Sequence, residues 1–374
     1  MIRRLEHRAD GRRLEPAAGI GVLTVVAILY TLVGGIRSII WTDVIQTVVF
    51  VGAAGAALVM LRSRIPLPLG EIARTLSETR VDGGSKLAVL NLSANLTQPY
   101  TIWSVALAFS LLGIASYGTD HDLAQRMLTC RSAVKGSQSV VVAILLNLPV
   151  LLVFISIGLL LHIFYGRPDL MGGFAPAVQP EHGREVFLSF ILNEMPRGMR
   201  GLMMAGLFAA GLGSTLSAIN AMSAAFVNDC YRKIRPAVTD RECLVIGRWA
   251  VVGWGLILGS FACICILWQE GSGKTLIDFA LSVMTFAYAG LLGVFFTAIF
   301  TRRGNTTSAI AALVVGFLVV LLFQEKVWGL LTSSMPPSLA GFHPAWPWHL
   351  FAGTIAATSV CCLGNPAPRA SAET

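Results

Sequence analysis

Long apolar segments follow one another along almost the whole chain, separated by short polar connections. A helix needs about 20 mostly apolar residues to cross roughly 30 Å of hydrocarbon. By this measure nine segments are candidate spans, the last two of them short: residues 17–35, 44–61, 101–118, 139–164, 201–227, 245–267, 276–300, 308–323 and 347–363. None of them alternates strictly between apolar and polar residues as a barrel strand does. Because hydrocarbon offers the backbone no hydrogen-bond partner, the pattern predicts an all-α bundle of about nine transmembrane helices.

The composition agrees with a membrane protein. Hydrophobic residues make up 55% of the chain and charged residues only 13%, whereas a soluble domain carries about 25% charged residues. The net charge of +8 is spread over the connections, which favours lipid headgroups over nucleic acid as the partner. The seven cysteines lack metal-ligand spacing, so we expect them to be packing residues. The sequence therefore predicts a multi-pass protein of the cell membrane with no nucleic-acid partner.

Polar tails at residues 1–16 and 364–374 flank a transmembrane domain at residues 17–363. If the connection at 118–138 is cytoplasmic, basic residues are modestly denser on the cytoplasmic side, as the positive-inside rule requires. The same orientation leaves the basic N-terminal tail outside, against that rule. This conflict makes the N-terminus itself suspect, and the charge pattern leaves open whether Met1 is the true start.

Four stretches, in order, resemble motifs of the sodium:solute symporter family, which includes sodium/glucose and sodium/proline symporters. They are YTLVGGIRSIIWTDVIQ at 30–46, GTDHDLAQRML at 118–128, GLMMAGLFAAGLGSTLSAINAMSAAFVNDCYRK at 201–233 and FAYAGLLGVFFTAIFTRRGN at 286–305. His121 stands where the family usually has glutamine. The resemblance covers roughly residues 20–363, nearly the whole chain.

The resemblance implies a leucine-transporter-like fold, in which two inverted repeats of five helices bind substrate and ion near the bilayer midplane. The first two spans correspond to the fourth and fifth core helices, and the next five form a complete second repeat. The first repeat is incomplete, because its first three helices have no counterpart here. We therefore expect a partial fold, with the missing helices lost by truncation or supplied by a separate polypeptide.

A sodium site is implied on the fifth span. Sodium is a hard cation, and hydroxyl and carbonyl oxygens bind such ions without burying a full negative charge. The family motif Ala-Ala-x-x-Ser-Ser-x-x-Ser-x-x-Asn aligns with AAGLGSTLSAIN at 209–220. The resemblance places sodium-binding positions at Ala210, Gly213, Ser214, Thr215 and Ser217. Gly213 replaces the first serine ligand, and Thr215 next to it could partly substitute.

Helix packing is the alternative for this segment. Gly206, Ala210 and Ser214 repeat every four residues, a small-xxx-small pattern that lets membrane helices approach closely. Serine and threonine hydroxyls in such helices often bond a carbonyl one turn back. The spacing alone favours packing, and the resemblance favours the ion site.

Two further sets of candidate residues follow from the motifs. Asp43 is interpreted either as an ion or gating carboxylate, which could pair with Arg37, or as a first-turn residue that the helix dipole favours. The resemblance places substrate-binding positions at Gly113, Ser116, Tyr117 and Asp120, with ordinary bundle packing as the alternative. Asp120, His121 and Asp122 cannot converge on one metal ion, since a helix face is shared only at three or four residues apart.

The family implies sodium-coupled symport of a small organic solute by alternating access, with Na⁺ as coupling ion and no further cofactor or metal. Because the first repeat is incomplete, we expect this polypeptide not to transport alone. The alternative function is a non-transporting membrane subunit or sensor derived from a symporter. An enzyme is not expected, because no cluster of nucleophile, base or metal ligands lies at bilayer depth.

Overall fold

The computed structural model describes residues 2–81, 84–174, 176, 178–180, 183–332 and 343–365, with side chains undescribed at 2–16, 34–39, 81, 184, 270, 326 and 332. The C-terminal tail from 366 onward lies outside the described residues. The chain divides into two compact units, one of residues 1–87 and 125–271 and the other of residues 88–124 and 272–374. Each of the nine predicted spans lies within helix, apart from at most one residue at an end.

Five described helices are long and apolar enough to cross a membrane, and a sixth span results if Ile102–Gly118 and His121–Leu128, bent by 46°, count as one. The five are Ile40–Arg64, Ala133–Gly166, Arg197–Ile234, Asp240–Gln269 and Leu276–Phe300. Shorter apolar helices cover Ala17–Val33 and Thr306–Leu322. The predicted all-α transmembrane bundle is thus confirmed.

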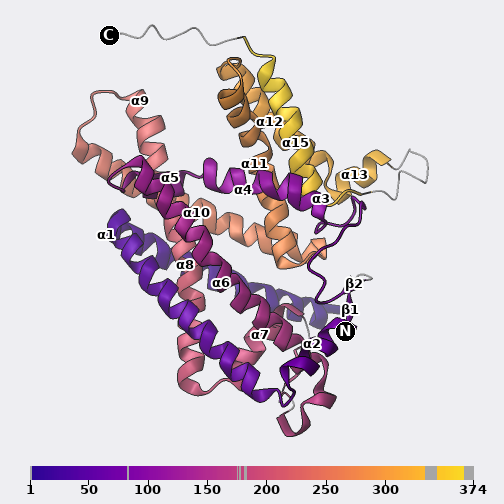
Figure 1. Cartoon of the computed structure of the whole chain (residues 1–374). Coiled ribbons are helices and arrows are strands. Elements are labelled where there is room, and N and C mark those ends of the chain that lie inside the picture. The colour runs from indigo at the N-terminus through magenta and orange to yellow at the C-terminus, as the bar shows by residue number, and fades with distance from the viewer. Residues whose placement is uncertain are drawn as a thin grey trace. The chain divides into compact units, whose positions relative to one another are not determined.

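The first unit begins with helix α1 (Ile2–Arg64), which contains the first two predicted spans without a loop between them. Yet the hydroxyls of Tyr30 and Thr42 share a hydrogen bond. Twelve residues of straight helix rise about 18 Å, more than the two side chains can bridge, so α1 must change direction between them. Gly34 and Gly35 lie in this interval, and glycine pairs are a common cause of sharp kinks. Figure 1 shows the two arms of α1 running in different directions.

The other long helices of the first unit are α6 (Ala133–Gly166), α8 (Arg197–Ala225) and α10 (Asp240–Ser272). Helix α6 packs on the second arm of α1 and α8 contacts both arms, whereas α10 lies beside the first arm, where Cβ atoms on Gly255 and Gly259 would meet Ile28 and Thr24. Shorter elements complete the unit: α2 (Leu69–Glu78), the antiparallel hairpin of β1 (Arg80–Val81) and β2 (Gly84–Ser85), the 3-10 turns η2 (Pro168–Leu170), η3 (Gly172–Phe174) and η4 (Gly183–Glu185), α7 (Val186–Ser189), the π-helical segments η5 (Phe190–Glu194) and η6 (Phe226–Tyr231), and α9 (Arg232–Ile234).

A buried ion pair closes the end of this unit where α1 stops. The Arg64 guanidinium contacts Glu194 through Nη1 to Oε2 at 2.5 Å and donates from Nη2 to its backbone carbonyl at 2.7 Å. Glu194 is only 6% exposed. Nearby, Phe164 and Phe190 are fully buried and stack edge to face. These contacts fix the C-terminal end of α1 against the start of α8.

The second unit contains α3 (Ile102–Ser104), the π-helical η1 (Val105–Phe109), α4 (Ser110–Gly118), α11 (Leu276–Phe300), α12 (Thr306–Leu322), α13 (Glu325–Thr332) and α15 (Trp346–Cys362). Helices α11, α12 and α15 run side by side (Figure 1). They come close because Gly290 and Gly316 meet at the crossing, where a Cβ on Gly316 would be 2.5 Å from the Cα of Gly290. Helix α5 (His121–Leu128) contains the boundary between the two units.

Candidate functional site

A charged cluster in the first unit joins three elements that are far apart in sequence. The Nη2 group of Arg126, on α5, lies 2.9 Å from Oδ2 of Asp43 on α1 and donates to Oγ of Ser217 on α8 at 2.5 Å. Ser217 is buried at 6% exposure, while the Arg126 and Asp43 side chains are 31% and 22% exposed. We call these three residues the Asp43–Arg126–Ser217 cluster.

Glycines on α8 let α1 approach closely enough to form this cluster. A Cβ on Gly213 would lie 2.9 Å from Oδ1 of Asp43 and 3.1 Å from Oε1 of Gln46. A Cβ on Gly206 would lie 3.1 Å from the Cα of Phe50. Glycines seven residues apart lie on nearly the same helix face. The missing side chain at 213 therefore provides the space that the carboxylate and the amide occupy.

The predicted sodium-binding residues differ in burial and in the side of α8 on which they lie. Gly213 and Ser217 are buried and lie beside α1, whereas Ala210 and Ser214 are exposed. The Ser214 hydroxyl lies 3.4 Å from the carbonyl of Ala210, and Thr215 donates to the carbonyl one turn back at 3.0 Å. Thr215 is rotated roughly 160° from Ser217 around the helix axis. The hydroxyls of Thr215 and Ser217 therefore point to nearly opposite sides of α8.

The predicted small-xxx-small packing of α8 is wrong in its spacing. Gly206 does pack against α1, but Ala210 and Ser214 are exposed. The second close approach is made by Gly213 instead. The two close approaches of α8 to α1 are thus seven residues apart, at Gly206 and Gly213, and they face Phe50 and Asp43, which are also seven apart.

Asp43 has a partner that the sequence did not indicate. The backbone is helical on both sides of Asp43, but the membrane-crossing segment of α1 covers Ile40–Arg64, so the interpretation of Asp43 as a first-turn residue of the second span stays a prediction. Its carboxylate pairs with Arg126, and the side chain of Arg37, the expected partner, lies outside the described residues.

Gln46 and Arg126 are the functional candidates that sequence reasoning missed. Both belong to the quoted stretches, Gln46 as the last residue of WTDVIQ and Arg126 within LAQRML. The signal was therefore present in the resemblance. It could not be assigned to a site, because nothing in a single sequence says which distant side chains meet.

The predicted substrate-binding residues lie in the second unit. Gly113, Ser116 and Tyr117 on α4 share one face, as spacings of three and four residues require, and Tyr117 is 48% exposed. Asp120 follows the end of α4, and its Oδ1 accepts a hydrogen bond from the backbone N–H of Leu123 at 3.1 Å. This is the geometry of a helix N-cap, so Asp120 has a structural role at the start of α5.

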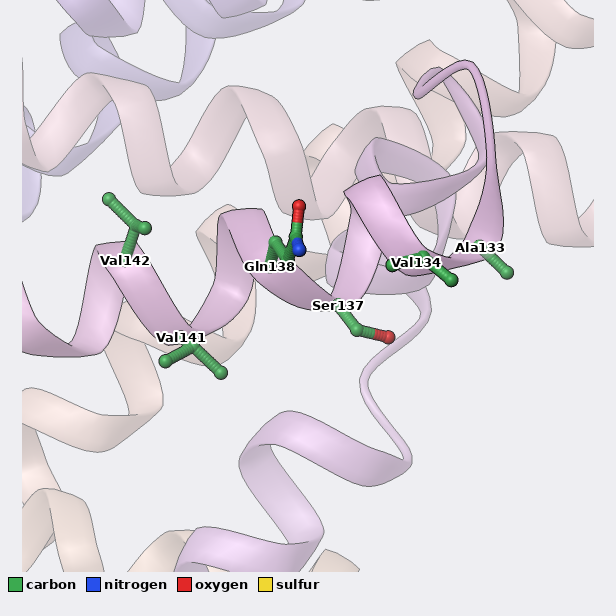
Figure 2. A pocket seen from close by; sticks show the side chains of 6 residues that line it. All are labelled: Ala133, Val134, Ser137, Gln138, Val141 and Val142. Carbon is green, nitrogen blue, oxygen red and sulfur yellow. The ribbon is translucent and has the colours of Figure 1, made fainter.

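A hollow of about 600 Å³ lies beside the start of α6. Figure 2 shows that all six lining side chains come from this one helix. Four of them are apolar, and the polar ones are Ser137 and Gln138. A single exposed helix face without a charged group gives no basis for a binding site, so the candidate site remains the Asp43–Arg126–Ser217 cluster.

Comparison with known proteins gives consistent matches. A sodium/sialic acid symporter of Proteus mirabilis (strain HI4320) is 25% identical over 328 residues, covering 82% of this chain and 60% of the relative. The human sodium/iodide cotransporter is 26% identical over 322 residues, covering 84% of this chain and 46% of the relative. A solved structure of a substrate-bound, outward-open Na⁺-coupled sialic acid symporter aligns with a TM-score of 0.73 at 22% identity, covering 95% of this chain and 68% of that one.

The apolar helices and these matches define a multi-pass integral membrane protein with the fold of a sodium-coupled symporter. The sodium:solute symporter family model matches residues 14–316. The chain therefore belongs to the sodium:solute symporter family, as its motifs predicted. It spans roughly half to 60% of the length of the curated relatives it matches.

Proposed function

We propose that the chain serves sodium-coupled symport of a small organic solute, with Na⁺ bound next to the Asp43–Arg126–Ser217 cluster. The observation that carries this proposal is the convergence of charged and polar oxygens on α8 at the segment that resembles the family's sodium motif. Relatives with sodium in their names, such as the sodium/sialic acid symporters and a sodium/mannose cotransporter, support the choice of ion.

The chemistry of the cluster suits a hard monovalent cation. Oδ1 of Asp43 and Oε1 of Gln46 both reach the bare backbone of Gly213, at 2.9 and 3.1 Å from its Cβ position. Carboxylate and amide oxygens are ligands that hard cations accept. Burying one carboxylate is costly unless a cation compensates it, and sodium or Arg126 can supply that charge.

Arg126 gives the proposed site a competing internal cation. Its guanidinium pairs with Oδ2 of Asp43 and also donates a hydrogen bond to the hydroxyl oxygen of Ser217. A sodium ion at Asp43 would repel this guanidinium, since two cations within about 4 Å interact unfavourably even in a screened environment. We propose that sodium binding releases Arg126 from Asp43, so that ion entry loosens the attachment of α5 to α1 and α8. This gives Asp43 the gating role expected from its motif.

Among the predicted ligands, Gly213 and Ser217 belong to this proposed site together with Asp43. Ala210 and Ser214 are exposed on α8 and stay predictions as additional oxygen donors. Thr215 is the weakest of the five, because its hydroxyl is on the far side of the helix from Ser217.

For the solute, we propose contact with the α4 face formed by Gly113, Ser116 and Tyr117. Tyr117 offers an exposed ring and hydroxyl, a combination that suits a small polar organic molecule. Asp120 is better explained as the cap of α5 and is the least supported of the predicted substrate-binding residues.

Purified chain in neutral detergent tests the sodium proposal through its thermal unfolding in NaCl and in KCl of equal concentration. A ligand that binds only the folded state raises stability by RT ln(1 + [L]/Kd). We expect sodium to raise Tm above the potassium value, and Asp43→Asn to remove the difference. Arg126→Gln should lower the sodium concentration needed for half of the effect, since it removes the competing cation. A sodium effect that both variants leave unchanged would refute the site.

A further inference from the structure

A second cavity in the first unit lies apart from the Asp43–Arg126–Ser217 cluster. It measures about 640 Å³ and is bounded by the first arm of α1, the C-terminal end of α8 with η6, and the start of α10. Part of its lining is apolar, with Leu32 from α1, Val227 from η6 and Leu244 from α10. We call it the α1–α8–α10 groove.

Two arginines and one carboxylate, that of Asp240, line the polar part of this groove. Arg232 and Arg248 are both exposed. The guanidinium of Arg232 forms an ion pair with Asp240, 3.4 Å from its Oδ1, and donates from Nε to Sγ of Cys243 at 3.5 Å. Both side chains of the ion pair are exposed, Arg232 at 52% and Asp240 at 98%. Arg248 has no ion pair or hydrogen bond within the described part of the chain. Arg248 is therefore available to a ligand, and Arg232 can reach one at little cost, because its ion pair with Asp240 is exposed to solvent.

The surroundings of the groove carry a positive excess. Residues 228–248, which connect η6 to α10 and include its first turns, contain five basic and three acidic side chains. This stretch joins the ends of two predicted spans, so it lies at a membrane surface. In the orientation predicted from the basic connections, that surface is the cytoplasmic one, where anionic lipids create a negative potential.

We propose that the α1–α8–α10 groove binds an anionic phospholipid. The phosphate-bearing headgroup would contact Arg232 and Arg248, with the amide of Asn228 as an additional hydrogen-bond donor. The first part of an acyl chain would lie along the apolar wall. Basic pockets between transmembrane helices bind such headgroups for the same reasons of charge and shape. An apolar wall beside two arginines fits this amphipathic molecule better than a free anion, which has no apolar part.

A substitution at Gly247 tests the apolar wall of the groove separately from its two arginines. It lines the groove on α10, and a Cβ there would meet only Cγ2 of Val227, at an ordinary 3.9 Å. Gly247→Leu therefore fills the groove without changing its charge or clashing with the backbone. Gly253→Leu is the matched control, since a Cβ at this exposed position of the same helix meets nothing within 4 Å.

The experiment titrates phosphatidylglycerol or phosphatidylcholine into the purified full chain in neutral detergent and counts bound lipid by native mass spectrometry. We expect phosphatidylglycerol to bind more tightly than phosphatidylcholine. Each arginine near an anionic headgroup contributes about fivefold in affinity, so the double variant Arg232→Ala/Arg248→Ala should lose roughly 20–30-fold. Arg241→Ala, which removes a basic residue outside the lining, should change affinity by less than about twofold.

Gly247→Leu should weaken phosphatidylglycerol binding by about tenfold or more, while Gly253→Leu binds like the unaltered chain. Inorganic phosphate at the same concentration should not displace the lipid. The proposal is overturned if the double arginine variant binds phosphatidylglycerol like the unaltered chain, if both lipids bind equally, or if inorganic phosphate displaces the lipid at equal concentration. Unchanged thermal unfolding of each variant verifies that the comparison is made on folded protein.

Discussion

Replacing both members of the Asp43–Arg126 ion pair, singly and together, measures how firmly α5 is attached to α1. The closest charged atoms are 2.9 Å apart, which places the centres of charge about 4 Å apart. At that separation the attraction is about 4 kcal/mol at an effective dielectric constant of 20 and about 1 kcal/mol in water. Since the side chains are 31% and 22% exposed, we expect a coupling free energy between these limits, about 2 kcal/mol.

The assay is a double-mutant cycle of Asp43→Asn, Arg126→Gln and the double variant. The free energy of unfolding is measured in potassium-containing, sodium-free detergent, so that no sodium competes for the carboxylate. The control cycle uses Arg74 and Glu78, an ion pair on α2 with side chains 79% and 65% exposed, for which solvent screening predicts no coupling beyond error. If the Asp43–Arg126 coupling were as small as the control coupling, the reasoning about this cluster would be refuted.

Three further perturbations test other parts of the account. Gly206→Leu should lower the free energy of unfolding by about 1–3 kcal/mol, because its Cβ would meet the α1 backbone at 3.1 Å. Gly211→Leu is the control and should leave the free energy of unfolding unchanged, since a Cβ there meets nothing within 4 Å. Equal losses in the two variants would contradict this packing. Glu194→Gln should cost about 2–3 kcal/mol by leaving a cation without its buried partner, as measured by chemical unfolding. Partial burial of Tyr100 and the hydrogen bond from its hydroxyl to Oδ1 of Asp278 raise the pKa of Tyr100 above its ordinary value near 10. Its contribution to stability is therefore complete below pH 10 and is lost progressively as the pH rises further. Tyr100→Phe should flatten the fall of Tm between pH 9 and 11, and an unchanged fall would contradict this.

The positions of the helices could be predicted from the sequence because a membrane span is a local property. Twenty apolar residues in hydrocarbon must form a helix whatever surrounds them. The segments at 139–164 and 276–300 thus correspond to α6 and α11. The connection between the first two spans was less predictable. Hydropathy separates two spans around residues 36–43, whereas the backbone there stays helical and changes direction.

The candidate site was predictable only in part, because its geometry depends on contacts between distant segments. Asp43 and Arg126 are 83 residues apart, and Arg126 and Ser217 are 91 apart. The motifs identified Asp43 and Ser217 separately, but no local pattern pairs either with Arg126. The glycine at 213 looked like the loss of a ligand. In the structure the same position makes room for a carboxylate and an amide from α1.

The most direct test of the proposed sodium site compares two hydroxyls on opposite sides of α8. The measurement is the shift in Tm of the purified chain when KCl is replaced by NaCl, for Ser217→Ala and for Thr215→Ala. The account predicts that Ser217→Ala loses most of the sodium-specific shift, while Thr215→Ala keeps it. A shift that survives in Ser217→Ala, or that disappears only in Thr215→Ala, would contradict a sodium site at the Asp43–Arg126–Ser217 cluster.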